Sequence, residues 1–396
     1  MKHLTLTVGS AAALVASILG ATGGAHAAAS TTAANWTQVG VNAQHTGDNT
    51  FETVITRSNV SHLKHAFETK ILTGPDPIVA NGVVYLGDSA DGYVQAIDAA
   101  SGAVDWTRDA CNTGAETTAP AFAAGKVWVG LDDPGTAALS VAGASVGCFE
   151  SDLYTSPPSA AGGVVYAGGT DGIVVAINAT TRKILWQRCL QCSPSGGPSL
   201  ATPAVSADGS WLYIGSSTSG DVYKLNAATG ALVWTHYVDS CGESAVAVSG
   251  SSLFVSGCAV YALSATTGAQ LWHSTKIGST ISMPAVADGL VYVTAGGNYS
   301  GTFALNASTG KTMWSEPEFL GPLYPPTIAN GVVYVDFPEI SSLVMYDSTT
   351  GAQIGSLGSP LAREFTGSAT VVNGRVYIVS FNFESDTAYK LEAYQP

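Results

Sequence analysis

The feature that most constrains this chain is a short pattern that recurs eight times along it. Each copy has a proline or an alanine, a glycine five or six residues later, and an aromatic residue three or four positions after the glycine. The eight aromatic residues are Tyr85, Trp128, Tyr166, Tyr213, Phe254, Tyr292, Tyr334 and Tyr377. Their spacings run from 38 to 47 residues, which is the repeat length of a β-propeller blade.

Every copy of the pattern reads as β-structure. In the first copy, the apolar residues 78–80 end at Asn81-Gly82, a strong hairpin signal because both turn residues must accept a positive φ. Residues 83–86 are β-branched, aromatic or aliphatic, and two further strands follow, the last of them ending at Trp106. No stretch shows a sustained helical period. We therefore predict an all-β fold: an eight-bladed β-propeller of four-stranded antiparallel blades.

A tryptophan recurs at one place in the fourth strand of five blades. The set is Trp106, Trp186, Trp234, Trp272 and Trp314. Aromatic residues of this kind can stack on a ligand, but their fixed place in the repeat favours packing of one blade against the next. The second and seventh blades have Gly147 and Gly355 in this region, so we expect weaker outer strands there.

The two chain ends are predicted to share the last blade. The eighth copy stops at residues 389–394, which read as a third strand, and no fourth strand remains. Residues 59–67 near the other end have the right length and place Phe67 where a blade tryptophan would lie. We expect this segment to complete blade eight, which closes the ring and leaves it without an exposed edge.

The first 27 residues have the features of a secretory signal. A short basic start precedes a mostly apolar stretch from Leu4 to Leu19, and Ala25-His26-Ala27 offers a small-residue cleavage pattern. The apolar stretch is shorter than a membrane span. We predict a cleaved signal peptide at residues 1–27, a lead-in at 28–58 and the propeller at 59–396. The mature protein is then secreted or extracytoplasmic, without membrane insertion.

The charge of the chain restricts its partners. Without the predicted signal, 14 lysine and arginine residues stand against 29 aspartate and glutamate residues, a formal charge of −15. Nucleic acids and anionic lipids are bound through basic surfaces. This balance therefore argues against both as partners.

Six cysteines in an exported chain predict disulfides. They are Cys111, Cys148, Cys189, Cys192, Cys241 and Cys258. Cys241 and Cys258 flank the first hairpin of the fifth blade, so we expect them to pair within that blade. Cys111 and Cys148 each follow a fourth strand and are candidates for a bridge between blades one and two. Cys189-Leu-Gln-Cys192 is interpreted as a structural disulfide, local or to a neighbouring blade, with a redox pair as the alternative.

The units resemble the pyrroloquinoline-quinone (PQQ) repeat. The resemblance rests on residues 77–87 with 96–106 and on 203–215 with 225–234, and it extends over about residues 36–396. The lead-in residues around Trp36, His45 and Asn59 are also similar to the start of these propellers. The family is specific for fold and broad in function, because it includes quinoprotein alcohol dehydrogenases, an outer-membrane assembly lipoprotein and many exported proteins.

The residues fit the enzymatic branch of that family poorly. Quinoprotein alcohol dehydrogenases carry an adjacent Cys-Cys disulfide over the cofactor, whereas here two residues separate Cys189 from Cys192. Cys192 is followed by serine rather than histidine, so a haem-attachment motif is missing. We predict no bound cofactor, with PQQ and Ca²⁺ as the alternative.

Other candidate chemistry has an ordinary structural explanation. The histidines at 45, 62, 65, 236 and 273 are scattered, without the spacing of a metal site. Asp88 with Asp91, and Asp132 with Asp133, offer oxygens suited to Ca²⁺, yet aspartate beside glycine is also common turn chemistry. The sequence therefore predicts no catalytic, cofactor-binding or metal-binding residue.

These observations favour a binding or scaffolding protein over an enzyme. We expect a monomeric exported propeller that presents loops or a channel mouth to a protein or polysaccharide of the cell envelope. The alternative is a PQQ-dependent dehydrogenase-like oxidoreductase or a carbohydrate-active enzyme.

Overall fold

The computed structural model describes most of residues 35–396. Its gaps lie at residues 75, 133–134, 151–154, 193–196, 198, 240–244, 275–276, 278–279, 298–299, 318–323, 359–363 and 383–385. The chain divides into two compact units, Met1–Thr32 and Ala33–Pro396. The predicted signal peptide therefore lies outside the described residues. No helix of the described part has the length and apolar character needed to cross a membrane.

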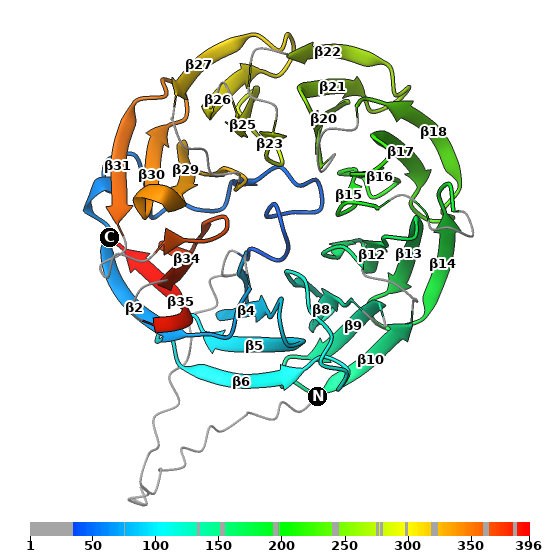
Figure 1. The fold of residues 1–396 in the computed structure, drawn as a ribbon, viewed down its shortest axis with the longest axis horizontal. Coiled ribbons are helices and arrows are strands. Elements are labelled where there is room, and N and C mark those ends of the chain that lie inside the picture. The colour runs from blue at the N-terminus through cyan, green and yellow to red at the C-terminus, as the bar shows by residue number, and fades with distance from the viewer. Residues whose placement is uncertain are drawn as a thin grey trace, which may run out of the picture. The chain divides into compact units, whose positions relative to one another are not determined.

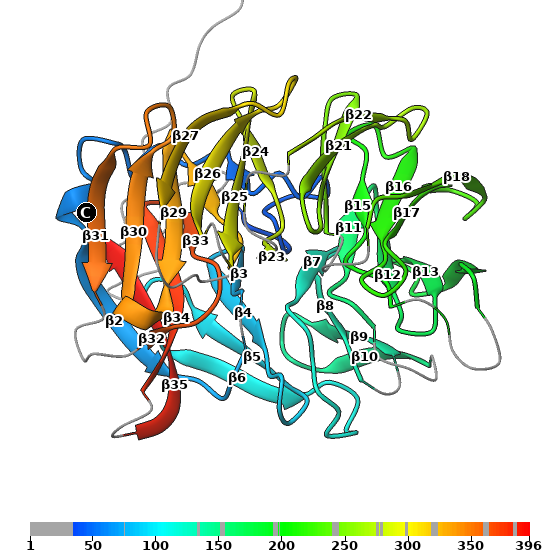
Figure 2. The same cartoon turned by 45° about the horizontal axis from the view of Figure 1, so that its top comes forward.

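Residues 35–396 form an eight-bladed β-propeller, as predicted (Figure 1). Each blade is an antiparallel sheet whose strands run in order from the ring axis to the rim, and the tilted view shows β29, β30 and β31 side by side in one such sheet (Figure 2). The innermost strands are β3 (Ile78–Ala80), β7 (Ala121–Ala123), β11 (Ser159–Ala161), β15 (Ala204–Val205), β19 (Val246–Ser249), β24 (Ala285–Ala287), β28 (Thr327–Ala329) and β33 (Thr370–Val372).

The next two strands of each blade carry the repeat pattern. The second strands are β4 (Val83–Gly87), β8 (Lys126–Gly130), β12 (Val164–Gly168), β16 (Trp211–Gly215), β20 (Ser252–Ser256), β25 (Leu290–Gly296), β29 (Val332–Phe337) and β34 (Arg375–Asn382). The third strands are β5 (Tyr93–Asp98), β9 (Gly135–Ser140), β13 (Ile173–Asn178), β17 (Asp221–Asn226), β21 (Val260–Ser264), β26 (Gly301–Asn306), β30 (Ser342–Asp347) and β35 (Asp386–Gln395).

The outermost strands form the rim of the ring. They are β6 (Val104–Asp109), β10 (Ser145–Glu150), β14 (Ile184–Cys189), β18 (Leu232–Tyr237), β22 (Gln270–Ser274), β27 (Thr312–Pro317), β31 (Gln353–Gly358) and β2 (Lys64–Lys70). The remaining described elements are short: β1 (Asp48–Asn49), β23 (Thr280–Ile281), β32 (Glu364–Phe365) and the 3₁₀ turns η1 (Val60–His62) and η2 (Pro338–Ile340).

The ring closes where the two chain ends meet in blade eight. β2, from the N-terminal side, pairs antiparallel with the last strand β35, with Phe67 opposite Ala393 (Figure 1). The prediction of this closure is confirmed, but its bounds differ. Residues 60–62 form η1, and the strand runs from Lys64 to Lys70 rather than from 59 to 67.

The repeat aromatics hold each blade against the next one. In blade three, the Tyr166 hydroxyl and the Trp186 indole N–H both donate to the carbonyl of Ala227 in blade four, at 3.4 and 3.0 Å. Tyr292 and Trp314 of blade six converge in the same way on the carbonyl of Ser348. The tryptophans therefore pack between blades, and the apolar core lies at these interfaces rather than at the ring axis.

A glycine completes each of these interfaces. Gly310 of blade six adopts φ +67°, and a Cβ added there would lie 2.5 Å from the ring of Trp272 in blade five. Across the closing interface, a Cβ on Gly102 of blade one would lie 2.4 Å from Phe67. Phe67 thus occupies the tryptophan position of blade eight, as the sequence predicted.

The interface between blades two and three is built differently. Gly147 stands in the tryptophan position of blade two, and the positive-φ turn position of blade three is held by Arg182 instead of glycine, at φ 61°. The Arg182 side chain reaches back to Gly147 and donates a hydrogen bond to the carbonyl of Val146. The large and the small residue have exchanged sides, so the space is still filled.

Candidate functional site

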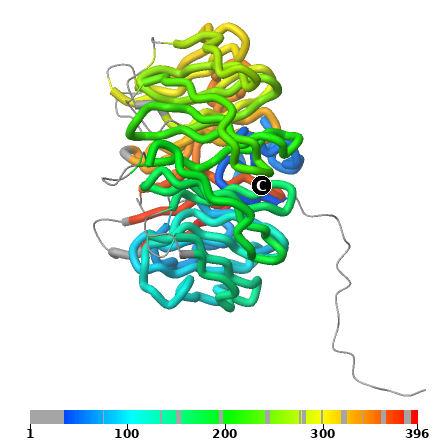
Figure 3. Tube along the Cα trace, turned by 90° about the vertical axis from the view of Figure 1, so that its right-hand side faces the viewer, coloured from blue at the N-terminus to red at the C-terminus, as the bar shows by residue number. Residues whose placement is uncertain are grey.

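The axis of the ring is occupied by the chain's own N-terminal segment. Residues 36–49, the axial segment, follow the inner wall and contact the blades in chain order (Figure 1). The hydrogen bonds join Trp36 to Val79, Thr37 to Phe122, Gln38 to Ala160, Ala43 to Val205, Gln44 to Val248, Thr46 to Val286, Gly47 to Ile328 and Asn49 to Val371, from blade one to blade eight. Seen edge-on, the segment, in blue, lies toward one face (Figure 3).

Local polar contacts and glycines shape the axial segment. The Asn42 side chain accepts the backbone N–H groups of Gln44 and Thr46, which folds the segment into a tight turn. Gly47 has φ +64°, and a Cβ there would lie 2.6 Å from the side chain of Ala285. From the sequence we predicted this stretch as part of a lead-in at residues 28–58, before the propeller. Its strand β1 pairs parallel with β28 of blade seven, so the lead-in is part of the ring.

His45 is the most enclosed titratable group of the axial segment. It is fully buried, and its Nε2 lies 2.7 Å from the Ser159 hydroxyl of blade three. Burial lowers the pKa of His45 to about 4, with a backbone hydrogen bond to Val246 of blade five acting in the opposite direction. His45 is therefore a neutral structural bridge at neutral pH, which agrees with its structural interpretation from sequence.

The pKa of Asp48, in contrast to that of His45, is raised. Partial burial, and next the charge of Asp288, raise the pKa of Asp48 to about 6. Asp288 belongs to the hairpin turn of blade six, with φ 50°. The Asp288 carboxylate thus disfavours the charged form of Asp48.

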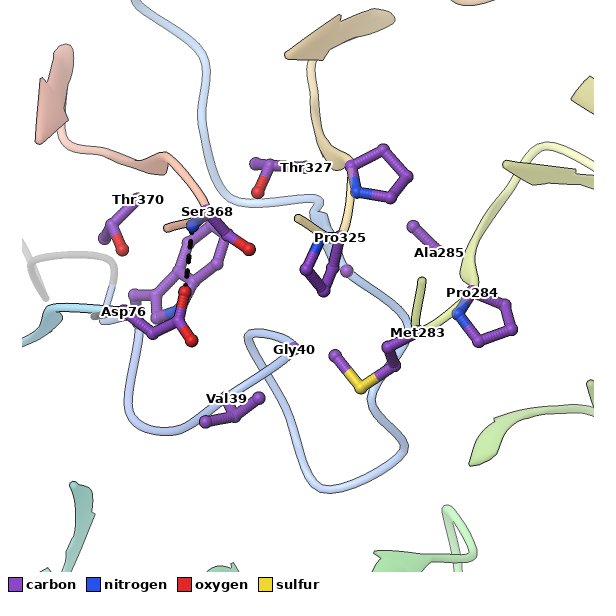
Figure 4. A pocket seen from close by; sticks show the side chains of 13 residues that line it. Val39, Gly40, Asp76, Met283, Pro284, Ala285, Pro325, Thr327, Ser368 and Thr370 are labelled. Carbon is purple, nitrogen blue, oxygen red and sulfur yellow. Dashed lines mark hydrogen bonds between the residues drawn. The ribbon is translucent and has the colours of Figure 1, made fainter. Parts of the chain in front are cut away.

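A small cavity remains next to the axial segment. Its volume is about 30 Å³, enough for about two water molecules. Val39 and Gly40 of the axial segment, Met283 and Pro284 of blade six and Asp76 line it among others (Figure 4). The Asp76 carboxylate points toward Ser368 and accepts its backbone N–H at 2.9 Å.

The lining of this cavity does not fit PQQ. PQQ is a flat, fused-ring molecule with three carboxylates, and it needs both a wide slot and cationic side chains. The cavity has no lysine or arginine among its lining residues, and its carboxylate would repel an anion. We derive no chemistry through PQQ at this place, and the absence of a cofactor stays a prediction.

Of the aspartates considered for Ca²⁺, Asp88 stabilises a turn. Asp88 is buried, and one carboxylate oxygen accepts the hydroxyl of Thr73 and the N–H of Ala90 at the start of its own turn. Asp91 is exposed, and Asp133 lies outside the described residues. Within the described part of the chain, no three potential ligands of the histidine, cysteine, aspartate or glutamate type come together.

Two disulfides are fully described, and they differ in kind. Cys111 pairs with Cys148 across 37 residues and joins the loop after β6 to β10, so it links blades one and two. Cys189 pairs with Cys192 within one loop, across three residues. Chain entropy assigns about 4 kcal/mol to the first closure and about 2 kcal/mol to the second. Cys258 is also disulfide-bonded, and its expected partner Cys241 lies outside the described residues.

The rim carries a set of exposed apolar residues that sequence reasoning missed. Each outer strand has a β-bulge just before the tryptophan position, which leaves one residue without a partner in the ladder. In blades three to six this residue is apolar and about half exposed: Leu185 50%, Val233 49%, Leu271 54% and Met313 55%. We call these four the rim residues. The equivalent position in blade one is the charged, exposed Asp105.

Comparison with curated proteins finds two kinds of relative. The outer membrane protein assembly factor BamB of Escherichia coli is 36% identical over 104 residues, which is 26% of either chain. Tetrathionate hydrolase of Acidithiobacillus ferrooxidans is 27% identical over 235 residues, 48% of this chain and 45% of the relative. The chain thus spans from a quarter to less than half of the length of these relatives.

Solved structures share the fold at low identity. Quinohemoprotein alcohol dehydrogenase from Comamonas testosteroni has a TM-score of 0.74 at 15% identity, covering 91% of this chain and 80% of that one. BamB from Moraxella catarrhalis has a TM-score of 0.67 at 16% identity, covering 84% and 100%.

A family model spans nearly the whole described ring. It matches residues 17–236, 170–273 and 218–389, in overlapping stretches, and its description is that of the outer membrane protein assembly factor BamB. Because this model matches most of the chain and the eight blades close into a ring, the chain belongs to the BamB-like family of PQQ-repeat propellers.

Proposed function

We propose that this protein is a non-enzymatic, extracytoplasmic scaffold that binds a protein partner at its rim. The observation that carries the proposal is the set of rim residues. Four consecutive blades expose an apolar side chain at the same bulge, whereas the equivalent residue is the charged Asp105 in blade one and a half-buried side chain in the other three blades. We infer that these four side chains, at equivalent positions of neighbouring blades, act together as one interaction surface, which is the role of exposed apolar patches in other proteins.

Two further features support a scaffold. The axial segment runs along the inner wall of the ring and bonds to every blade, and a small cavity lies beside it. The family description and the BamB relatives are those of a protein assembly factor. A rigid ring whose outer strands repeat the same geometry is suited to holding an extended or folded protein along its edge.

Site-specific photo-crosslinking in the producing cell tests the proposal. We expect a probe at Leu185 or Val233 to yield discrete protein adducts, and a probe at the equivalent Asp105 of blade one to yield few. Replacing Leu185 and Val233 together by serine should weaken binding of the adducted protein about tenfold or more. Equal crosslinking at Asp105, or unchanged binding by the double variant, would contradict the rim assignment.

The enzymatic alternative has a direct assay. Purified protein supplied with PQQ and Ca²⁺ is tested for dye-linked oxidation of alcohols and sugars. We expect no turnover above that of protein supplied with neither. Turnover that requires PQQ would overturn the scaffold proposal.

A further inference from the structure

The Cys189–Cys192 disulfide has an unusual place on the ring. β14 ends at Cys189, and the next three residues form the start of the loop that leads to blade four. Both cysteines are exposed, whereas in the interblade disulfide Cys148 is exposed and Cys111 is half-buried. The short bridge joins no two blades, so it is not needed to hold blades together.

The two residues between the cysteines are anchored by contacts other than the disulfide. Leu190 is buried, and its N–H donates to the carbonyl of Gly172, which fixes the loop to the hairpin turn of its own blade. Gln191 adopts φ 55°, and its side-chain amide donates to the Asp221 carboxylate of blade four at 3.2 Å. Opening the disulfide therefore leaves the loop anchored at two points.

One sulfur is also favoured as a thiolate. The backbone N–H of Cys192 donates to the Cys189 Sγ at 3.1 Å. A hydrogen bond to the charged form of a group stabilises that form, and a stabilised thiolate is a better leaving group in thiol–disulfide exchange. Cys148 of the interblade disulfide is also exposed, and its Sγ lies 3.6 Å from the Ser145 hydroxyl. The anchored loop within one blade and the backbone N–H at the Cys189 sulfur distinguish the Cys189–Cys192 pair from a purely structural bridge, which the sequence had favoured.

We propose that Cys189–Cys192 is an exchangeable disulfide that takes two electrons from thiols of a partner. A partner thiolate attacks the Cys192 Sγ, the Cys189–Cys192 bond breaks, and Cys189 leaves as the thiolate that its neighbour's N–H stabilises. A second partner thiolate then attacks the partner sulfur of the mixed disulfide and releases Cys192. The partner gains one disulfide, and Cys189 and Cys192 become thiols after taking up the two protons that the partner thiols lost.

Mild reduction of the folded full-length mature protein tests this proposal. The protein is exposed to low concentrations of dithiothreitol, quenched with a maleimide and mapped by mass spectrometry. We expect Cys189 and Cys192 to be labelled at least about tenfold sooner than Cys111 and Cys148, which serve as the control within the same molecule. The circular dichroism spectrum should stay unchanged. Equal labelling of both pairs, or labelling only as the protein unfolds, would overturn the proposal.

A monothiol probe tests the direction of attack. With reduced glutathione and an acid quench, we expect the adduct on Cys192 rather than on Cys189. A Cys189→Ser variant should form the glutathione adduct at Cys192 when given oxidised glutathione and keep its fold, because the Leu190 anchor remains. An adduct found mainly on Cys189 of the unmodified protein would contradict the assigned leaving group.

Discussion

The interfaces between blades and the axis of the ring are stabilised in different ways. The interfaces repeat one device, an aromatic residue of one blade packed on a glycine turn of the next, as in Trp272 on Gly310. The axis is held by a single segment in which each residue makes a different contact, as His45 does with Ser159. A repeated device tolerates an exchange of partners, as Arg182 and Gly147 show, whereas a segment used once has no second copy to compensate.

The largest expected effect is at the closing interface. Deleting residues 59–70 removes β2 together with the buried side chains of Val60 and Leu63, and we expect a loss of about 5 kcal/mol or more, enough to prevent folding. A chain that begins at Asn42 is the control at the axis. It loses Trp36 but keeps the closed ring, and its melting temperature should fall less. Equal melting temperatures for the two deletions would contradict the distinction between interface and axis.

Glycine substitutions separate backbone strain from interface packing. Gly310→Ala combines a positive φ with overlap on the Trp272 ring, and we expect a loss of about 3 kcal/mol in the free energy of unfolding. Gly289→Ala has φ +76° and open space around it, so only the strain of about 1 kcal/mol is expected. Urea denaturation measures both, and similar losses would show that the glycines do not define the interface.

Acid should weaken the axis through His45. Its folded pKa of about 4 lies below the ordinary 6.5, so between these values the unfolded chain binds a proton that the folded chain does not. The contribution of His45 to the free energy of unfolding is complete above pH 6.5, and it decreases by about 3 kcal/mol as the pH drops to about 4.

Asp48 changes the free energy of unfolding in the opposite direction, so the effect of His45 should be measured in a variant that lacks the Asp48 carboxyl group. Its raised pKa adds stability as the pH falls from about 6 to 3.8. The loss due to His45 should therefore be read from denaturation at pH 7 and pH 4.5 in the Asp48→Asn protein. It should disappear when His45→Asn is added.

The interface between blades two and three can be tested by giving Gly147 and Arg182 the residues that the other blades have at these positions. Gly147→Trp alone should destabilise the protein by about 2 kcal/mol, because a Cβ there would lie 2.9 Å from the Phe149 ring and the Arg182 side chain occupies the space beyond, at 3.8 Å. Adding Arg182→Gly should restore at least about 1 kcal/mol as a coupling energy. Additive losses in thermal unfolding would mean that the two positions do not compensate each other.

The smallest expected effect lies in blade four. The Lys224 ammonium donates to the Ala265 carbonyl at 2.8 Å, the position that a tryptophan N–H takes in blades three, five and six. Lys224→Met removes a buried charge and frees that carbonyl for Trp234, so we expect a change within about 1 kcal/mol. A loss well above this in urea denaturation would show that the ammonium is an essential part of the interface.

Most of the fold could be predicted from the sequence because the same repeat pattern occurs eight times. The aromatic and glycine positions, the four-strand order and Phe67 in the tryptophan position all follow from comparing one copy with another. The rim residues were missed because the bulge that exposes them is a backbone feature, and Leu185 or Met313 otherwise reads as part of an ordinary strand.

The sequence by itself determined the eight blades, their antiparallel strands and the sharing of blade eight by the two chain ends. Only the tertiary structure decided the course of the axial segment, since its contacts are mostly backbone hydrogen bonds to partners far away in the chain, such as that from Ile328 to Gly47. Backbone groups are the same in every residue, so such contacts leave no periodic mark in the sequence. For the same reason the anchoring of Cys189–Cys192 by Leu190, and the N–H that faces the Cys189 sulfur, became visible only in three dimensions.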